Sequence, residues 1–366
     1  MIESVRVVVD LQFGSTGKGL IAGYLAARTA PDTVMTAWAA NAGHTYVDAK
    51  GRRYVHTMLA NGVVSPGLAQ LMIGPGSIID PVNLQNELES CRELLHDVTI
   101  LIHPHAAVIT AEHRQLEQGP MTKIGSTKKG VGEAAIQRIR RDPDNQNVAR
   151  VALQNTTLAQ YVASIGEWGD AIHRANRVQV EGAQGVGLSL YHGFYPYVTS
   201  RDVSTYQILA DVGLPFDVCE RVDVIGTMRT YPIRVANRYD DSGKQVGWSG
   251  PCWPDQHELD WERDLGLTAE LTTVTKLPRR IFTLSYEQLR YAVELTGCDA
   301  LFLNFANYLN DEQELLDMVE RLELICPVRW IGMGPTDSDV LQMGGSPDDL
   351  RRRLRMHRQA FRGAPL

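Results

Sequence analysis

Hydrophobic residues along this chain fall into two alternating patterns. Apolar residues recur every three or four positions over residues 82–96, 285–296 and 312–324, which predicts helices there. Strands alternating with helices favour an α/β fold around a large, mostly parallel central sheet, with helices on both faces and ligands at the carboxyl ends of the strands. The strands themselves are predicted from short apolar runs at residues 5–9, 54–59, 70–73, 98–102, 178–180, 222–226, 231–235, 300–303 and 328–332.

The sequence gives no sign of a boundary between domains. It has 366 residues without an internal repeat, a low-complexity segment or a linker, so we expect a single domain over residues 1–366 with loop insertions. Residues 237–264 are polar, with Gly, Pro and Trp, and are predicted to form a long surface excursion. The arginine-rich residues 348–362 are predicted to form a solvated helix.

Charge and cysteine content argue against several classes of protein. The chain carries 36 basic and 43 acidic residues, a net charge of -7, which argues against nonspecific nucleic-acid binding as the main activity. Its five cysteines include no Cys-x-x-Cys pair, so neither a disulfide framework nor a zinc site is indicated. No signal-peptide pattern and no apolar run of about 20 residues occurs, so we expect a soluble cytoplasmic protein without a membrane partner.

The most informative stretch directly follows the first predicted strand. Residues 10–19 read Asp-Leu-Gln-Phe-Gly-Ser-Thr-Gly-Lys-Gly, and a helical pattern follows them. Three glycines around a lysine, between a strand and a helix, are typical of a loop whose backbone N–H groups face a phosphate. The loop is not a Walker A motif, because Gln12 stands where its first Gly belongs and Gly19 replaces the Ser or Thr after Lys18. On its own, the stretch is equally compatible with a bare glycine-rich turn.

A second string, Asn-Ala-Gly-His-Thr at residues 41–45, narrows the interpretation. Together with the loop it resembles the adenylosuccinate synthetase family, whose loop reads Gly-Asp-Glu-Gly-Lys-Gly and whose next signature is Asn-Ala-Gly-His-Thr. The resemblance covers nearly the whole chain. It continues in the same order with Ile-Gly-Ser-Thr at 124–127, Glu-Gly-Ala-Gln-Gly at 181–185 and His-Gly-Phe-Tyr-Pro-Tyr-Val-Thr-Ser at 192–200.

The resemblance implies a ligase that joins aspartate to a 6-oxopurine nucleotide. In the family, an aspartate base removes the N1 proton while the 6-oxygen attacks the γ-phosphate of GTP, and the amino group of aspartate then displaces the phosphate. The positions matching the catalytic residues are Ser15, Lys18 and His44, and Mg²⁺ is expected among the phosphates, at Ser15 and Gly43. The residues expected to contact the phosphoryl donor are Gly14, Ser15, Thr16, Gly17, Lys18, Gly19, Gly43, His44, Thr45, Asn307, Gly334 and Pro335.

The same resemblance implies a site for the purine monophosphate and aspartate. In the family, the arginine matching Arg141 reaches across a dimer interface to the nucleotide 5′-phosphate, so a homodimer is expected. A solvated basic helix is the alternative for Arg138, Arg140 and Arg141. The residues expected to contact these substrates are Ser15, Asn41, Ser126, Thr127, Arg141, Gln184, Leu188, Thr199, Val235, Thr275, Leu277 and Arg279.

Three departures from the family pattern change the expected substrates. Ser15 stands where the family has its aspartate base, and a serine cannot act as a carboxylate base or a charged magnesium ligand. Asn-Phe-Ala-Asn at residues 304–307 replaces a guanine-reading Thr-Lys-Leu-Asp, and the neutral amide of Asn307 suits adenine. Leu277 replaces an arginine near the ribose 2′-hydroxyl, so the site should accept a deoxyribonucleotide.

Together these departures resemble the phage branch of the superfamily, which makes 2-aminoadenine for phage DNA. The expected substrates are dGMP, L-aspartate and ATP or dATP, and the expected product is 2-amino-2′-deoxy-N6-succinyladenylate. Two alternatives are an adenylosuccinate synthetase that acts on IMP and a catalytically silent nucleotide-binding protein.

His103 and His105 would lie on one face of a strand, which suggests a metal site. The sequence argues against one, because no nearby carboxylate or thiol supplies a third ligand.

Overall fold

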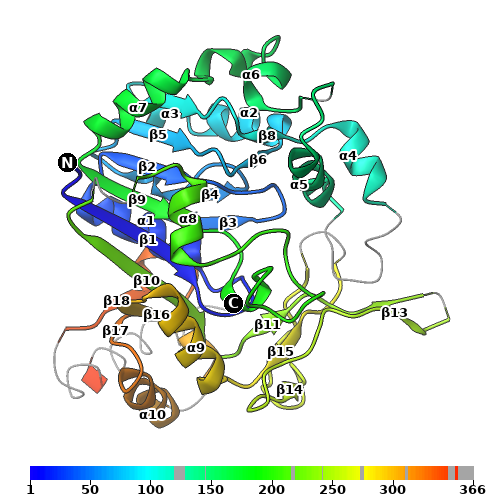
Figure 1. Ribbon diagram of the computed structural model, residues 1–366. Coiled ribbons are helices and arrows are strands. Elements are labelled where there is room, and N and C mark those ends of the chain that lie inside the picture. Colours follow the sequence, from blue (N-terminus) through cyan, green and yellow to red (C-terminus); the bar gives the residue numbers. More distant parts are fainter. Residues whose placement is uncertain are drawn as a thin grey trace.

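A sheet of nine strands forms the centre of the molecule (Figure 1). The computed structural model describes residues 1–118, 128–144, 146–215, 219–240, 242–272, 276–309, 312–344 and 351–352. The strand order is β18-β17-β16-β10-β1-β9-β2-β5-β7, and neighbouring strands are parallel except β17 and β18, which confirms the predicted sheet. These strands are β1 Ser4–Asp10, β2 Thr33–Thr36, β5 Gln70–Ile73, β7 Thr99–Ile102, β9 Arg177–Glu181, β10 Val222–Arg229, β16 Ala300–Asn304, β17 Val328–Gly332 and β18 Val340–Gln342.

Helices cover both faces of this sheet, because its strands bury side chains on both sides. On β1, Val5, Val7 and Val9 belong to one hydrophobic cluster and Val8 belongs to the other. Helices α1 and α2 pack in the cluster of Val8, and α7, α8, α9 and α10 pack in the opposite one. The helices are α1 Lys18–Thr29, α2 Pro81–Ser90, α3 Arg92–Leu95, α4 Ala111–Leu116, α5 Val131–Arg140, α6 Ala149–Ala152, α7 Ile165–Arg174, α8 Thr205–Asp211, α9 Tyr286–Thr296 and α10 Glu312–Glu323.

Short strands and 3₁₀ turns complete this framework. The hairpin of β12 and β13 projects from the body of the molecule (Figure 1). The short strands are β3 His44–Val47, β4 Arg53–His56, β6 Ile78–Ile79, β8 Ala107–Val108, β11 Ile233–Arg234, β12 Arg238–Tyr239, β13 Gln245–Gly247, β14 Glu258–Leu259 and β15 Arg280–Phe282. The turns are η1 Asn61–Val64, η3 Thr157–Tyr161, η4 Val186–Leu188, η6 Ala306–Tyr308 and η7 Asp337–Asp339.

Two predicted elements between residues 53 and 96 are wrong in extent. The helix predicted over residues 82–96 is two helices, α2 and α3, because Cys91 leaves the helical conformation with φ of -101° and ψ of 9°. The strand predicted over residues 54–59 ends at His56. Beyond it, the backbone N–H groups of residues 57–59 donate to the carboxylate of Glu87 instead of to a neighbouring strand.

The predicted surface excursion at residues 237–264 is also wrong in part. It contains β12, β13 and β14, and it buries Trp261 against Ile233 and Ile281 in a small third hydrophobic cluster. Of the helix predicted over residues 348–362, only residues 351–352 are described, and they are helical. Among the described residues, no helix has the length and apolar character needed to cross a membrane.

Candidate active site

The loop of residues 10–19 joins β1 to α1 at the carboxyl edge of the sheet. Gly14, Ser15 and Gly17 adopt left-handed conformations, with φ of 88°, 57° and 90°. Only glycine fits at Gly17, because an added Cβ would lie 2.1 Å from the side-chain amide of Asn304. The N-terminus of α1 therefore opens onto a tightly curved loop, and helix ends of this kind favour a bound phosphate.

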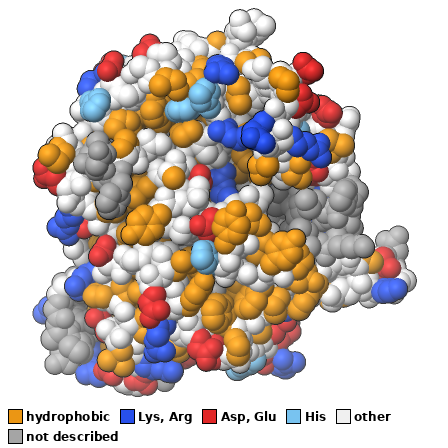
Figure 2. All heavy atoms as spheres, in the orientation of Figure 1, with side chains coloured by type: hydrophobic (Ala, Val, Ile, Leu, Met, Phe, Trp, Pro, Cys, Tyr) orange, Lys and Arg blue, Asp and Glu red, His pale blue; other side chains and the backbone are white. Residues whose placement is uncertain are grey.

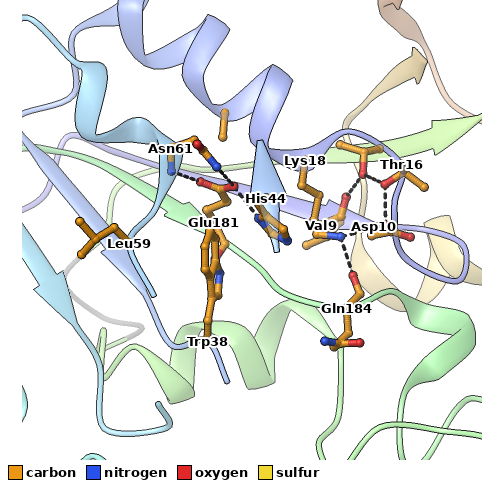
Figure 3. Close-up of polar contacts among 12 residues, drawn as sticks. Val9, Asp10, Thr16, Lys18, Trp38, His44, Leu59, Asn61, Glu181 and Gln184 are labelled. Atoms are coloured by element: carbon orange, nitrogen blue, oxygen red, sulfur yellow. Dashed lines mark hydrogen bonds and ion pairs between the residues drawn. The ribbon is translucent and has the colours of Figure 1, made fainter. Parts of the chain in front are cut away.

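The Lys18 ammonium lies between two acceptors (Figure 3). Its Nζ donates to Oδ2 of Asp10 at 2.8 Å and to the carbonyl oxygen of Gln184 at 2.7 Å. Both members of the ion pair are buried, with side-chain exposures of 2% for Lys18 and 0% for Asp10. The fold therefore fixes the candidate phosphate lysine where the end of β1 meets the turn that follows β9.

His44 lies near Lys18, at the first residue of β3 (Figure 3). Its Nδ1 is 2.7 Å from Oε1 of Glu181, the last residue of β9. The backbone N–H of Asn61 donates to the other carboxylate oxygen at 2.7 Å, and the Trp38 ring lies edge-on to the imidazole with centroids 4.2 Å apart. Because a carboxylate only accepts, Nδ1 carries a proton and Nε2 is the nitrogen that can exchange one with a substrate.

Burial and the Glu181 carboxylate have the largest effects on the pKa of His44, with smaller ones from the charges of Lys18, which lowers it, and Asp10, which raises it. Burial is the larger one and lowers the pKa of His44 below its usual value, whereas the Glu181 carboxylate favours the imidazolium and raises it. Since Nδ1–H is donated to Glu181, only the imidazolium can donate from Nε2. The carboxylate therefore extends the pH range in which His44 can act as an acid.

Several residues expected to hold the purine monophosphate converge on the same edge. Gln184 follows β9 with φ of 66°, and its side-chain amide nitrogen lies 3.4 Å from Oδ1 of Asn41. The carbonyl of Leu188 accepts from the N–H of Thr199 at 2.7 Å. The Leu188 side chain faces the loop, because its Cδ1 would lie 3.8 Å from a Cβ added at Gly14. The structure thus brings residues 41, 184, 188 and 199 together beside the phosphate loop.

A second cluster lies on the other side of the loop, where β10 and β16 end. Arg229 is fully buried, donates to the carbonyl of Ser15 at 3.2 Å and forms an ion pair with Glu270. The same carboxylate accepts from the Tyr308 hydroxyl at 2.7 Å. Asn307 is half-buried in η6, directly beside Tyr308 in sequence. This cluster connects the loop that carries Ser15 to the segment expected to contact adenine.

Gly334 and Pro335 follow β17 at the same edge, and the next turn anchors them. Asp337 in η7 forms two hydrogen bonds with the guanidinium of Arg28 on α1, at 2.7 and 2.9 Å. It also accepts from the Tyr46 hydroxyl on β3 at 2.6 Å. Through these contacts the segment that follows Gly334 and Pro335, both expected to contact the phosphoryl donor, is tied to the helix and the strand that carry Lys18 and His44.

Three of the remaining predicted contacts lie within the described residues, at positions 235, 277 and 279. Val235 follows β11 and is half-buried, and Leu277 is partly exposed. Arg279 is half-buried near Glu270; burial lowers the pKa of Arg279, and the Glu270 carboxylate opposes this. Ser126, Thr127 and Thr275 lie outside the described residues.

Arg141 lies apart from the phosphate loop of its own chain. It ends α5 in a left-handed conformation with φ of 56° and is exposed. With Arg138 and Arg150 it lines a hollow of about 340 Å³. Figure 2 shows Lys and Arg side chains gathered over α5. The Arg141 side chain is therefore accessible from solvent.

The two histidines that follow β7, His103 and His105, are hydrogen-bonded to protein groups. Nδ1 of His103 accepts from the backbone N–H of His105, and burial lowers the pKa of His103 to about 4. Nε2 of His105 lies 3.0 Å from Arg150. In the described part of the chain, no group of three or more His, Cys, Asp or Glu side chains is placed to hold a metal ion.

Sequence reasoning assigned no role to Asp10 or Glu181. Both residues belong to the motifs of residues 10–19 and 181–185, and they supply the carboxylates that hold Lys18 and His44. A usable signal was present, because each acidic residue ends an apolar strand, where a carboxylate needs a charged or hydrogen-bonding partner. The partner of Glu181 lies 137 residues away in the chain, which sequence spacing does not show.

Comparisons with known proteins identify the family of this chain. The adenylosuccinate synthetase family model matches residues 7–145 and 143–320. The N6-succino-2-amino-2′-deoxyadenylate synthase of Salmonella phage PMBT28 is 53% identical over 365 residues, covering 92% of this chain and 97% of the relative. The cyanophage S-2L succinoaminodeoxyadenylate synthetase bound to dGMP and dATP matches with a TM-score of 0.89 at 43% identity, covering 96% of this chain and 98% of that one. The Plasmodium falciparum adenylosuccinate synthetase shares the fold, with a TM-score of 0.72 at 19% identity, covering 93% and 100%. This chain belongs to the adenylosuccinate synthetase family.

Proposed function

We propose that this protein joins L-aspartate to carbon 6 of dGMP, using ATP or dATP as the phosphoryl donor. The products are 2-amino-2′-deoxy-N6-succinyladenylate, ADP or dADP, and phosphate. The observation that carries the proposal is Ser15, an exposed serine at the family's aspartate position, within a site that keeps Lys18 and His44. The phage relatives support the same substrates, since one is named as a synthase of this product and another holds dGMP and dATP.

Two steps make up the proposed reaction. The 6-oxygen of dGMP first forms a bond to the γ-phosphorus while the bond to the leaving ADP or dADP breaks, and the N1 proton of dGMP passes to water. Lys18 stabilises charge on the transferring group, and His44 donates from Nε2 as this charge develops. The amino group of aspartate then attacks carbon 6, and phosphate leaves with the original 6-oxygen. Glu181 keeps His44 in the required tautomer.

A magnesium ion fits this site if the nucleotide phosphates supply most of the negative charge of its ligands. The Ser15 hydroxyl and the Gly43 carbonyl are neutral oxygen donors, the ligand type that Mg²⁺ accepts beside phosphates and water. A Cβ added at Gly43 would meet no atom within 4 Å, so the backbone there leaves room for a hydrated ion. When bound, the ion would neutralise charge on the phosphates.

The other expected contacts form part of the same proposal. We assign Asn307, with Gly334 and Pro335, to the adenine of the donor, and Leu277 to the deoxyribose of dGMP. We assign Arg141 to the 5′-phosphate bound by a second copy of the chain, which makes a homodimer the working form. The chain would act as one catalytic domain with insertions.

Release of inorganic phosphate from ATP in the presence of aspartate tests the proposal. We expect release to depend on dGMP and the product to have the mass of dGMP plus aspartate minus water. Faster release with IMP than with dGMP would favour an adenylosuccinate synthetase instead. No release with either nucleotide, together with retained ATP binding, would favour a silent nucleotide-binding protein.

A further inference from the structure

The carboxylate of Asp10 has two separate sets of partners. Its Oδ1 accepts from the backbone N–H groups of Gln12 at 2.9 Å and Gly14 at 3.2 Å, which shapes the phosphate loop. Its Oδ2 accepts from the Thr16 hydroxyl at 2.5 Å and from the Lys18 ammonium at 2.8 Å. One oxygen therefore serves the backbone of the loop, and the other serves side chains expected to contact the nucleotide.

Asp10 is poorly suited to act as a base. Its side chain is fully buried, and four donors already occupy its oxygens. A Cβ added at Gly185 would lie 2.4 Å from Oδ1, so the turn after β9 packs directly on this carboxylate. Any effect of Asp10 on the reaction would therefore pass through the groups that it holds.

Lys18 is the group through which such an effect would pass. An ammonium has three N–H donors, and here one is directed to Asp10 and another to the Gln184 carbonyl, so their directions fix that of the third. Gln184 belongs to the turn expected to hold the purine. The position of the ammonium is thus set by the protein, relative to both the phosphate loop and the purine turn.

We propose that Asp10 is a positioning residue for phosphoryl transfer: it holds Lys18 between the phosphate loop and the purine turn, so that the ammonium meets the transferring phosphoryl group already oriented. Donors fixed in advance stabilise the charge of a transition state without reorganising during the reaction. This inference rests on the proposed function, because it concerns the same phosphoryl transfer.

Asp10→Asn separates the two roles of the carboxylate. The amide oxygen can replace Oδ1 and keep the loop N–H bonds, whereas the amide NH₂ would face the Lys18 and Thr16 donors. We expect kcat to fall by about 10²-fold, the usual cost of losing one oriented donor. The KM for ATP should stay within about threefold or fall, because the loop loses a negative charge while its backbone contacts persist.

Glu87→Gln is the matched control. Glu87 is also a buried carboxylate that accepts backbone N–H groups, but it lies on α2 at the loop after β4. We expect its kcat to stay within about twofold of wild type, so that a general loss from removing a buried charge can be separated from a loss at Lys18.

Two further variants test whether Asp10 acts through Lys18. In a Lys18→Met background, Asp10→Asn should change kcat by less than about threefold, because the group it positions is gone. Lys18→Arg keeps the positive charge but not the compact ammonium that fits between two acceptors, so it should lose most of kcat. This second variant keeps the inference testable if Asp10→Asn does not fold.

The possible outcomes separate the inference from the proposed function. If wild type turns over dGMP, three results would each overturn the inference and leave the proposed function standing. These are an unchanged kcat in Asp10→Asn, an equal loss of kcat from Asp10→Asn in the wild-type and Lys18→Met backgrounds, and full activity of Lys18→Arg. If IMP proves to be the substrate, the same variants are measured with IMP and judged in the same way. No turnover of any 6-oxopurine nucleotide by wild type would refute the proposed function and the inference together.

Discussion

Buried carboxylates occur in two regions of this molecule and do different work in each. At the carboxyl ends of β1 and β9, Asp10 and Glu181 hold the side chains of Lys18 and His44. In the layer of α2 and α4, Glu87 accepts the N–H groups of residues 57–59, and Glu117 accepts those that begin α5. All four carboxylates are nearly inaccessible to water.

The comparison shows that burial alone does not identify a functional carboxylate. A buried carboxylate needs compensation in either region, but backbone N–H groups carry no net charge, whereas Lys18 and a protonated His44 do. At the central sheet edge the carboxylates therefore hold two ionisable donors, Lys18 and His44, where an anionic substrate would bind. The helical layer uses the same chemistry to fix loops, which should affect stability rather than turnover.

The largest effect is expected for His44→Ala. Removing the imidazole deletes the proposed donor to charge that develops during phosphoryl transfer, and we expect kcat to fall by about 10²–10³-fold. The affinity for dGMP, measured by calorimetry, should change little, because Asn41 and Gln184 remain. If His44→Ala kept most of the wild-type kcat, the side chains held at the sheet edge would not be needed for turnover, and the contrast with the helical layer would fail.

A smaller effect, with a pH signature, is expected for Glu181→Gln. The Glu181 carboxylate raises the pKa of His44 against the effect of burial, so replacing it with a neutral amide should lower that pKa further. Activity that needs the imidazolium is lost as pH rises through the pKa, so the high-pH limb of the kcat profile should move to lower pH. A profile that only drops in height would indicate a structural role for Glu181.

Asn307→Asp should change the choice of donor more than the rate. Wild type is expected to turn over several-fold faster with ATP or dATP than with GTP. A carboxylate at this position could accept from the ring N–H and amino group of guanine, which should move the preference toward GTP. Competition between the two nucleotides gives the ratio directly, and a wild-type preference for GTP would contradict the assignment of this segment to adenine.

The smallest effect on turnover is expected for Glu87→Gln, the representative of the helical layer. Weakening its charge-assisted bonds to residues 57–59 should lower the free energy of unfolding by about 1–3 kcal/mol. Urea denaturation would measure this loss, while kcat per folded molecule stays near wild type. A loss of turnover comparable to that of Glu181→Gln would remove the distinction between the two regions.

The sequence predicted the framework better than the details of the site. Short, mostly apolar runs such as residues 70–73 and 328–332 became strands of those bounds, because strands within a largely buried parallel sheet leave that pattern. The break of the predicted helix at Cys91 depends on local backbone geometry that helical spacing does not reveal. The motifs located Lys18 and His44, but their partners lie 8 and 137 residues away, and only the folded sheet brings the second pair together.

The central claim, that the 6-oxygen of dGMP attacks the γ-phosphate, is tested most directly by isotope transfer. The protein would be supplied with dGMP carrying ¹⁸O at position 6, ATP and aspartate, and the released phosphate would be analysed by mass spectrometry. The account predicts one ¹⁸O in each phosphate released, because aspartate displaces the original 6-oxygen as part of that phosphate. Unlabelled phosphate, formed at the same rate as the aspartate adduct, would contradict it.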